Sequence, residues 1–339
     1  MDARLVAVGS LGGTIAMTPD SPGPTSPPTG AAGVVTPTLR ATDLLAAVPL
    51  LAEVAEVTAT DVRTMPGASL TEEDIREAFV WARAQVDAGA AGVVLTQGTD
   101  TLEETAYLLD LWWDRDAPLV LTGAMRSAAA PGADGPANLL AAVRTATSLQ
   151  ARQRGVLVVL DDQVHAASQV RKSHATATGA FTSPRTGPLG AVLEGRVSLR
   201  PSRRPTTVGL PTRSVRVALL ETYLGDDGAL LRAVADQGFD AVVVGAFGVG
   251  HVSAPLAEVV GDVVTRMPVV VASRTGAGST ARSTYGFTGS ETDLVRRGAY
   301  LAGWLDPRKA RVLTWAVLSS TSDPDRLALE LAARGEEPT

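Results

Sequence analysis

Short, continuous apolar runs alternate with longer amphipathic segments along most of the 339-residue chain. In the first half the runs fall at residues 5–8, 92–96, 118–122 and 155–160. Runs of this length are typical of strands buried on both faces, and their alternation with helices indicates a mainly parallel sheet. We therefore predict an α/β protein. It has a larger N-terminal domain, with a mainly parallel sheet and helices on both faces, and a smaller C-terminal α/β domain.

Helix start signals divide the amphipathic segments. Thr71 precedes three acidic residues and predicts a helix that runs to about residue 88, before Gly89. Residues 100–103 are expected to open a second helix that runs through residue 113; the structural alternative to a chemical role for Asp100 is that it caps this helix, with Glu103 completing a capping box. Pro136 suits the first turn of a third helix.

A change in pattern near residue 200 suggests a domain boundary. Residues 191–199 are expected to form a hairpin, and residues 200–213, rich in Pro and Arg, a linker. A second α/β series follows, with strands expected at 215–220, 241–245 and 269–273 and helices at 229–237, 254–265, 307–319 and 323–334. We predict domains at 1–199 and 214–339.

Residues 17–37 fit no packed element, because they contain six prolines and three glycines. A structureless stretch of this length in a compact domain is a lid or a solvated insertion. The composition leaves both readings open. Its position directly after the first strand and turn favours a mobile lid.

Composition excludes several classes of function. The chain has no cysteine, which excludes disulfides, thiol nucleophiles and zinc–thiolate sites. Its net charge of −6 gives no general attraction to nucleic acid, and no apolar run approaches the roughly 18 residues of a membrane span. The chain passes from Met1 directly into a strand-like segment without a signal-type start, so we expect a cytoplasmic protein.

Polar side chains gather where strands of a parallel sheet end, which is where such sheets bind ligands. Thr14 follows a Gly-Gly turn, Thr99 and Asp100 follow the second run, and Lys172 lies beyond the fourth. Only two of the 30 basic residues are lysines, and only a lysine can readily lose its proton. Two hydroxyls, an acid and a lysine suit hydroxyl-based acyl transfer. Taken singly, each of these residues also has an ordinary structural explanation.

Other signals are weaker. The Gly-Gly-Thr turn lacks the spacing of a phosphate loop, and Ser253 stands where a dinucleotide fingerprint at 248–253 needs its third glycine. His165, His174 and His251 lack metal-ligand spacing and are interpreted as ordinary loop histidines.

At these residues the sequence resembles the bacterial-type L-asparaginase family (asparaginase/glutaminase). The first two of the matching strings are the family's most specific signatures. The strings are Leu-Gly-Gly-Thr-Ile-Ala at 11–16, Gln-Gly-Thr-Asp-Thr-Leu-Glu-Glu-Thr-Ala-Tyr at 97–107, Gly-Ala-Met-Arg at 123–126, Ala-Asp-Gly-Pro at 133–136, Val-Arg-Lys at 170–172, Gly-Val-Gly at 248–250 and Tyr-Gly-Phe at 285–287.

The resemblance implies a role for each matching residue. Thr14 corresponds to the nucleophile that forms a β-acyl-enzyme, and Thr99, Lys172 and Asp100 to a relay that activates nucleophile or water. The implied substrate-binding residues are Gly67, Ala68, Ser69, Gly98, Thr99, Asp100, Ala124 and, from a neighbouring subunit, Ser253. The resemblance also implies a homodimer or homotetramer with sites at subunit interfaces, and no metal or organic cofactor.

Two departures from the family pattern stand out. The mobile loop of the family usually carries a Tyr, but here the loop offers only hydroxyls at 18, 21, 25, 26, 29 and 36. Gly67 stands where the family has a carboxylate-binding Ser, unless Ser69 takes that place. We therefore expect altered substrate recognition, and we expect Gly67→Ser to lower the KM for asparagine.

The sequence thus predicts hydrolysis of L-asparagine to L-aspartate and ammonia, with glutamine as a possible secondary substrate. The alternative is a low-activity or non-catalytic relative that binds aspartate or a related amino acid. A third possibility, an amidase acting on a tRNA-linked amide, is disfavoured by the acidic net charge.

Overall fold

The computed structural model describes residues 4–19, 35–37, 40–202 and 204–336. The chain divides into two compact units, 1–207 and 208–339, and each is described by itself. The division falls inside the segment expected as a linker, while the predicted domain boundaries stay a prediction.

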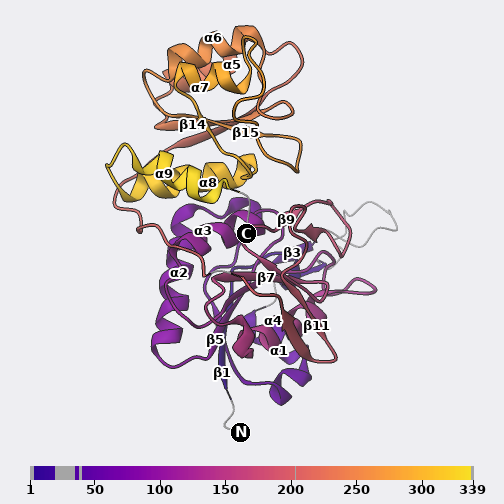
Figure 1. The fold of residues 1–339 in the computed structure, drawn as a ribbon. Helices are drawn as coiled ribbons and strands as arrows, with labels where there is room; N and C mark the ends of the chain where they lie inside the picture. Colours follow the sequence, from indigo (N-terminus) through magenta and orange to yellow (C-terminus); the bar gives the residue numbers. More distant parts are fainter. Residues whose placement is uncertain (1–3, 20–34, 38–39, 203, 337–339) are drawn as a thin grey trace. The chain divides into compact units, whose positions relative to one another are not determined.

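The first unit is built on an eight-stranded sheet with the order β12-β11-β8-β7-β6-β5-β1-β4 (Figure 1). Strands β4, β1, β5, β6 and β7 run parallel, and β8, β11 and β12 continue the sheet in antiparallel fashion. The strands are β1 (Leu5–Ser10), β4 (Glu56–Asp61), β5 (Gly92–Thr96), β6 (Leu119–Thr122), β7 (Val156–Leu160), β8 (Gln163–Ala166), β11 (Gly190–Leu193) and β12 (Arg196–Leu199).

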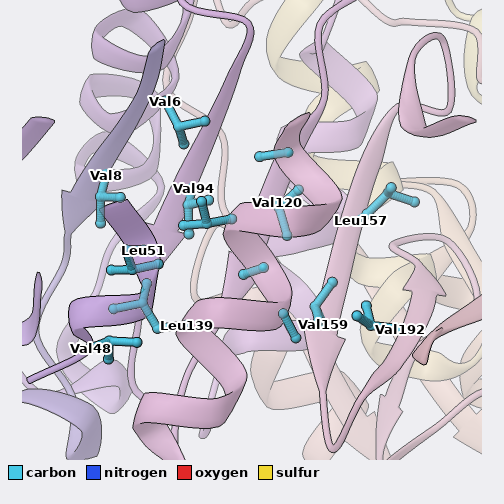
Figure 2. Close-up of a cluster of buried hydrophobic side chains, with 14 of the residues drawn as sticks. Val6, Val8, Val48, Leu51, Val94, Val120, Leu139, Leu157, Val159 and Val192 are labelled. Atoms are coloured by element: carbon cyan, nitrogen blue, oxygen red, sulfur yellow. The ribbon is translucent and has the colours of Figure 1, made fainter. Parts of the chain in front are cut away.

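Helices cover both faces of this sheet because its central strands are apolar on both sides. On one face, α1 and α4 pack on alternate strand residues, including Val6, Val8, Val94 and Leu157 (Figure 2). Helices α2 and α3 cover the other face. The helices are α1 (Ala41–Ala46), α2 (Glu72–Asp87), α3 (Leu102–Trp112) and α4 (Gly135–Thr147).

The parallel register brings the carboxyl ends of three strands side by side. Ser10 of β1 pairs with Thr96 of β5, which in turn pairs with Thr122 of β6. The segments that leave these strands therefore start at one edge of the sheet, where the sequence placed the candidate site.

Two short antiparallel ribbons lie outside the main sheet. One pairs β9 (Arg171–Lys172) with β10 (Phe181–Thr182), and the other pairs the backbones of β2 (Met17–Pro19) and β3 (Val35–Pro37). The expectation of no regular structure over 17–37 is thus wrong at the two ends of that segment. Residues 20–34, with most of the predicted lid and its candidate hydroxyls, lie outside the described residues.

The second unit holds a four-stranded parallel sheet with helices on both faces. Helices α5, α6 and α7 pack on one face of the sheet, and α8 on the other. The elements are β13 (Val217–Glu221), β14 (Ala241–Ala246), β15 (Val269–Ser273), β16 (Tyr300–Leu301), α5 (Ala229–Asp236), α6 (Ala254–Val263), α7 (Glu291–Arg297), α8 (Pro307–Ser320) and α9 (Arg326–Arg334).

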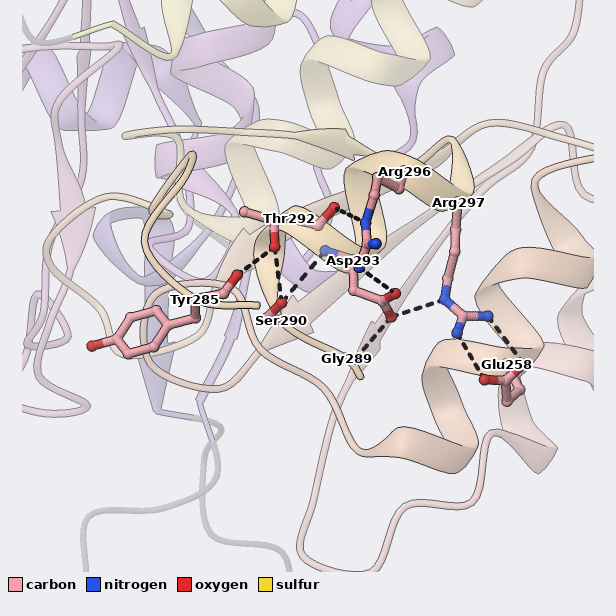
Figure 3. A network of polar contacts seen from close by, with 8 residues as sticks. All are labelled: Glu258, Tyr285, Gly289, Ser290, Thr292, Asp293, Arg296 and Arg297. Atoms are coloured by element: carbon pink, nitrogen blue, oxygen red, sulfur yellow. Dashed lines mark hydrogen bonds and ion pairs between the residues drawn. The ribbon is translucent and has the colours of Figure 1, made fainter. Parts of the chain in front are cut away.

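A polar network ties α7 to α6 in this unit (Figure 3). Asp293 accepts hydrogen bonds from the Gly289 N–H and from Arg297, and Arg297 also pairs with Glu258 of α6. Burial alone would raise the pKa of Asp293, but these hydrogen bonds hold it below its usual value.

The predicted fold class is confirmed. Most predicted elements are present with ends shifted by at most three residues, while β4, β8, β16, α1, α7 and the short ribbons were not predicted. Over the described ranges, no helix is both long enough and apolar enough to cross a membrane.

Candidate active site

The segments that follow β1 and β5 touch backbone to backbone. Gly13 has a φ of +89°, and a Cβ atom built on it would lie 2.0 Å from the Gly98 nitrogen. Only glycine fits this contact, because it needs both a left-handed backbone and an absent side chain. Thr14 and Thr99, which directly follow these two glycines, are thereby brought into the same region of the fold.

Gly67 joins the same contact. A Cβ atom on Gly98 would lie 3.0 Å from the Gly67 nitrogen and 3.2 Å from the Gly13 Cα. The Thr101 hydroxyl donates to the Gly67 carbonyl at 2.8 Å, and the Gln97 amide donates to the Thr101 hydroxyl at 3.1 Å. These bonds tie the segment around residue 67 to the start of α3.

The crowding at Gly67 changes the meaning of its substitution. A Cβ atom there would lie 2.9 Å from the Gly98 carbonyl oxygen, so a serine would push the two segments apart. The sequence suggested Gly67→Ser as a test of the missing hydroxyl. The structure shows that this variant would also move the backbone, so a change in KM would not report on the hydroxyl alone. Gly67 is buried, whereas Ala68 and Ser69 of the same turn are exposed.

Lys172 contacts both of its predicted partners. Its Nζ lies 2.9 Å from the Thr99 hydroxyl oxygen and 3.1 Å from Asp100 Oδ1. The lysine side chain is 17% exposed, while that of Asp100 is 65% exposed. The lysine side chain is thus largely enclosed, and the Asp100 side chain keeps an accessible surface that can accept a further cation.

The segment that supplies Thr99 also fixes the backbone of Lys172. Glu103 is buried, and its Oε2 accepts the Lys172 N–H at 2.5 Å. The predicted capping box is wrong, because α3 has Thr101 as its N-cap and no capping bond from that side chain. The predicted N-cap at Thr71 is confirmed by its hydrogen bond from the Asp74 N–H.

Ala124 lies in the loop that follows β6, and this loop is held from α4. Asn138 donates to the Gly123 carbonyl at 3.0 Å, and Asp134 accepts the Met125 N–H at 2.9 Å. Ala124 itself is buried. A Cβ atom on Gly135 would lie 2.9 Å from Ile15 and 3.4 Å from Ala124, so the start of α4 packs beside the segment that carries Thr14.

Ser253 belongs to the second unit, where it caps α6. Its hydroxyl accepts the Leu256 N–H at 3.1 Å and donates to the Asp226 carbonyl at 2.5 Å. These contacts give the residue a structural role within its own unit.

The histidines differ from their expected setting. His165 lies on β8 and not in a loop; it is fully buried, and its Nδ1 lies 2.9 Å from the Ser183 hydroxyl. Burial lowers the pKa of His165 to about 4, which keeps the ring neutral. His251 pairs with Glu291 in the second unit. Across the part of the chain that the structure describes, no three His, Asp or Glu side chains cluster as metal ligands would.

The fold and this edge of the sheet define a class: a two-unit α/β protein with two threonine loops, a lysine and an acid at the ends of parallel strands. Comparison with known sequences assigns the family. The profile described as "Asparaginase, N-terminal" matches residues 5–204, and that described as "Glutaminase/Asparaginase C-terminal domain" matches residues 216–329.

Similar proteins extend over nearly the whole chain. "L-asparaginase 2" of Escherichia coli is 32% identical over 335 residues, which cover 95% of this chain and 91% of that protein. "Glutaminase-asparaginase" of Pseudomonas fluorescens is 31% identical, covering 82% and 77%. The crystal structure of a probable cytoplasmic L-asparaginase from Campylobacter jejuni matches with a TM-score of 0.85 at 32% identity, over 98% of this chain and 99% of that one. The chain belongs to the asparaginase family.

Proposed function

We propose that this protein is an L-asparaginase that hydrolyses the side-chain amide of L-asparagine to L-aspartate and ammonia. The observation that carries the proposal is the contact of Lys172 with both Thr99 and Asp100, beside the backbone contact that draws the Thr14 loop to the Thr99 loop. Relatives named L-asparaginase over most of the chain support the same activity.

In the proposed reaction the Thr14 hydroxyl oxygen attacks the amide carbon. The C–N bond then breaks, the hydroxyl proton ends on the leaving nitrogen as ammonia, and a β-acyl ester with Thr14 remains. Water adds to this ester, the threonine oxygen leaves and regains a proton, and aspartate is released. Each step conserves atoms and needs no co-reactant other than water.

The proton transfers of this reaction are proposed to depend on Thr99, Lys172 and Asp100. A lysine amine within hydrogen-bond distance of a threonine hydroxyl can take that hydroxyl's proton when neutral and return it when charged. Asp100 stabilises the charged lysine, and its exposed side is proposed to accept the α-ammonium of the substrate.

The remaining contacts to substrate are proposed to come from the surrounding loops. Residues 67–69 are proposed to hold the α-carboxylate, and the backbone around Gly98 and Ala124 to hold the amide oxygen through N–H groups. Ser253 is proposed to complete the site of a neighbouring subunit in a homodimer or homotetramer. We also propose a cytoplasmic location.

The test is ammonia release with asparagine, with glutamine and without substrate. We expect Thr14→Ala to abolish turnover and Lys172→Met to lower kcat by a few orders of magnitude, roughly what removal of a positioned proton-transfer group costs. Thr58→Ala, on the exposed side of edge strand β4, is the control and keeps full activity. Circular dichroism confirms that each variant is folded.

Substantial turnover in a folded Thr14→Ala or Lys172→Met variant would overturn the assignment. Titration calorimetry with aspartate distinguishes an asparaginase from the alternative, a non-catalytic relative that binds aspartate. A wild-type protein that binds aspartate tightly but releases no ammonia is a binding protein and not an enzyme.

A further inference from the structure

Lys172 is held at two places by one short segment, residues 99–103. Thr99 and Asp100 contact its Nζ, and the Glu103 carboxylate accepts its backbone N–H at 2.5 Å. Glu103 is 2% exposed, so the carboxylate that binds this main-chain N–H is buried. The proposed reaction gives this group no chemical role.

The ribbon that carries Lys172 needs an external anchor. Strands β9 and β10 have two residues each and lie outside the eight-stranded sheet. A ribbon this short is not stable by itself, so its position has to be set by contacts with a firmer element.

Helix α3 is such an element. It has 11 residues, nearly all of them buried, and Glu103 lies in its first turn, where the helix dipole favours a negative charge. A hydrogen bond to a carboxylate is about twice as strong as one between neutral groups. The Glu103 bond therefore fixes the Lys172 backbone relative to the segment that carries its side-chain partners.

We propose that Glu103 is a positioning residue: by holding the Lys172 N–H it places Nζ between the Thr99 hydroxyl and Asp100. The proposal depends on the proposed function for its kinetic consequence, but not for its geometry. Without this bond the ribbon shifts, and the contacts of 2.9 and 3.1 Å are no longer held together.

The chain offers a direct spectroscopic test, because Lys172 and Lys309 are its only lysines. Selective ¹⁵N-lysine labelling gives two backbone amide signals, which a Lys172→Arg variant assigns. The Lys309 N–H also donates to a carboxylate, Asp306 at 3.1 Å, and serves as an internal reference. We expect Glu103→Gln to move the Lys172 amide proton upfield and to leave the Lys309 signal in place.

Glu104→Gln is the matched control, since it removes the neighbouring carboxylate on the same helix. It should leave the Lys172 signal in place. A Lys172 amide that does not respond to Glu103→Gln, or that responds equally to Glu104→Gln, overturns the positioning role whatever the activity of the enzyme.

Kinetics give the second readout. We expect Glu103→Ala to lower kcat by about 100-fold, the cost of misplacing a catalytic group by roughly 1 Å, with KM changed by less than about threefold. Glu103→Gln keeps an acceptor oxygen and should recover about tenfold of that loss, in line with a neutral hydrogen bond replacing a charged one. If Glu103→Ala does not fold, the kcat of Glu103→Gln is compared with that of wild type, and we expect it to be about tenfold lower.

A folded Glu103→Ala variant with wild-type kcat contradicts the proposal. A wild-type protein without asparaginase activity refutes the proposed function instead, and the amide signals then still decide whether Glu103 positions Lys172.

Discussion

The contact between Gly13 and Gly98 makes a sharp prediction about a single added methyl group. In Gly13→Ala the new Cβ atom would lie 2.0 Å from the Gly98 nitrogen, where ordinary contact begins near 3.4 Å. The two loops must therefore separate by about 1.4 Å, or the Gly13 backbone must leave its φ of +89°. Either change moves Thr14 relative to Thr99.

The magnitude follows from two contributions to the free energy of unfolding. A left-handed backbone costs a non-glycine residue about 1–2 kcal/mol, partly offset by about 0.4–1 kcal/mol from a less flexible unfolded chain. Overpacking adds about 1–3 kcal/mol, so we expect a net loss of about 1–4.5 kcal/mol. The shift between the loops should lower kcat/KM for asparagine by about 100-fold or more.

Gly89→Ala is the matched control. Gly89 also has a left-handed backbone, with φ of +106°, but no atom lies within 4 Å of a Cβ built there. We expect it to lose only about 1 kcal/mol of stability and no activity. Urea denaturation measures the first effect and ammonia release the second. Equal activity of the two variants would refute the idea that the glycine contact sets the spacing of the threonines.

Further predictions follow from the polar contacts. Thr101→Val removes the hydroxyl that donates to the Gly67 carbonyl, and we expect it to raise KM for asparagine more than it lowers kcat; an unchanged KM would speak against this support. Burial holds the pKa of His165 at about 4, below its unfolded value of 6.5. The unfolded chain therefore binds the proton first, and stability is lost as the pH falls from about 6.5 towards 4, by up to roughly 3 kcal/mol. His165→Gln should flatten this dependence in denaturation curves; an unchanged slope contradicts it. Asp293 has a lowered pKa, so its contribution is present above the unfolded value and is lost in acid, as the pH falls through the folded value. Asp293→Asn should therefore destabilise the protein at neutral pH, and by less as the pH falls below the unfolded value; an equal loss at neutral and at acid pH would show that the bond to Arg297 does not depend on charge.

The fold was largely predictable because its strands and helices carry strong patterns. The apolar runs at 92–96 and 269–273 coincide with β5 and β15, and each lies buried on both faces. The missed strand β4 has the sequence Glu-Val-Thr-Ala-Thr-Asp and forms the exposed edge of the sheet. An edge strand buries little, so its residues carry no apolar run.

The candidate site was predictable only in part. Strand ends can be located from sequence, and this placed Thr99, Asp100 and Lys172 near one another. Glu103 was interpreted as a helix cap because it lies three residues after Asp100. Its partner, however, is a main-chain N–H 69 residues further along the chain. Every residue except proline has a main-chain N–H, so no sequence pattern shows which one a distant carboxylate will bind.

The same reasoning explains the departure at residue 67. There the sequence shows only the loss of a hydroxyl that the family usually has, while the structure shows that a side chain has little room beside the Gly98 carbonyl. The missing hydroxyl and the close approach of the two backbones are linked, because the glycine that allows the close approach has no side chain to carry a hydroxyl. In the proposed function, carboxylate recognition at Gly67 then depends on its N–H, and the bond from Thr101 to the Gly67 carbonyl holds the next peptide group of the same turn. Substrate affinity at this end of the site should therefore follow the geometry of the main chain, which glycine at residue 67 permits.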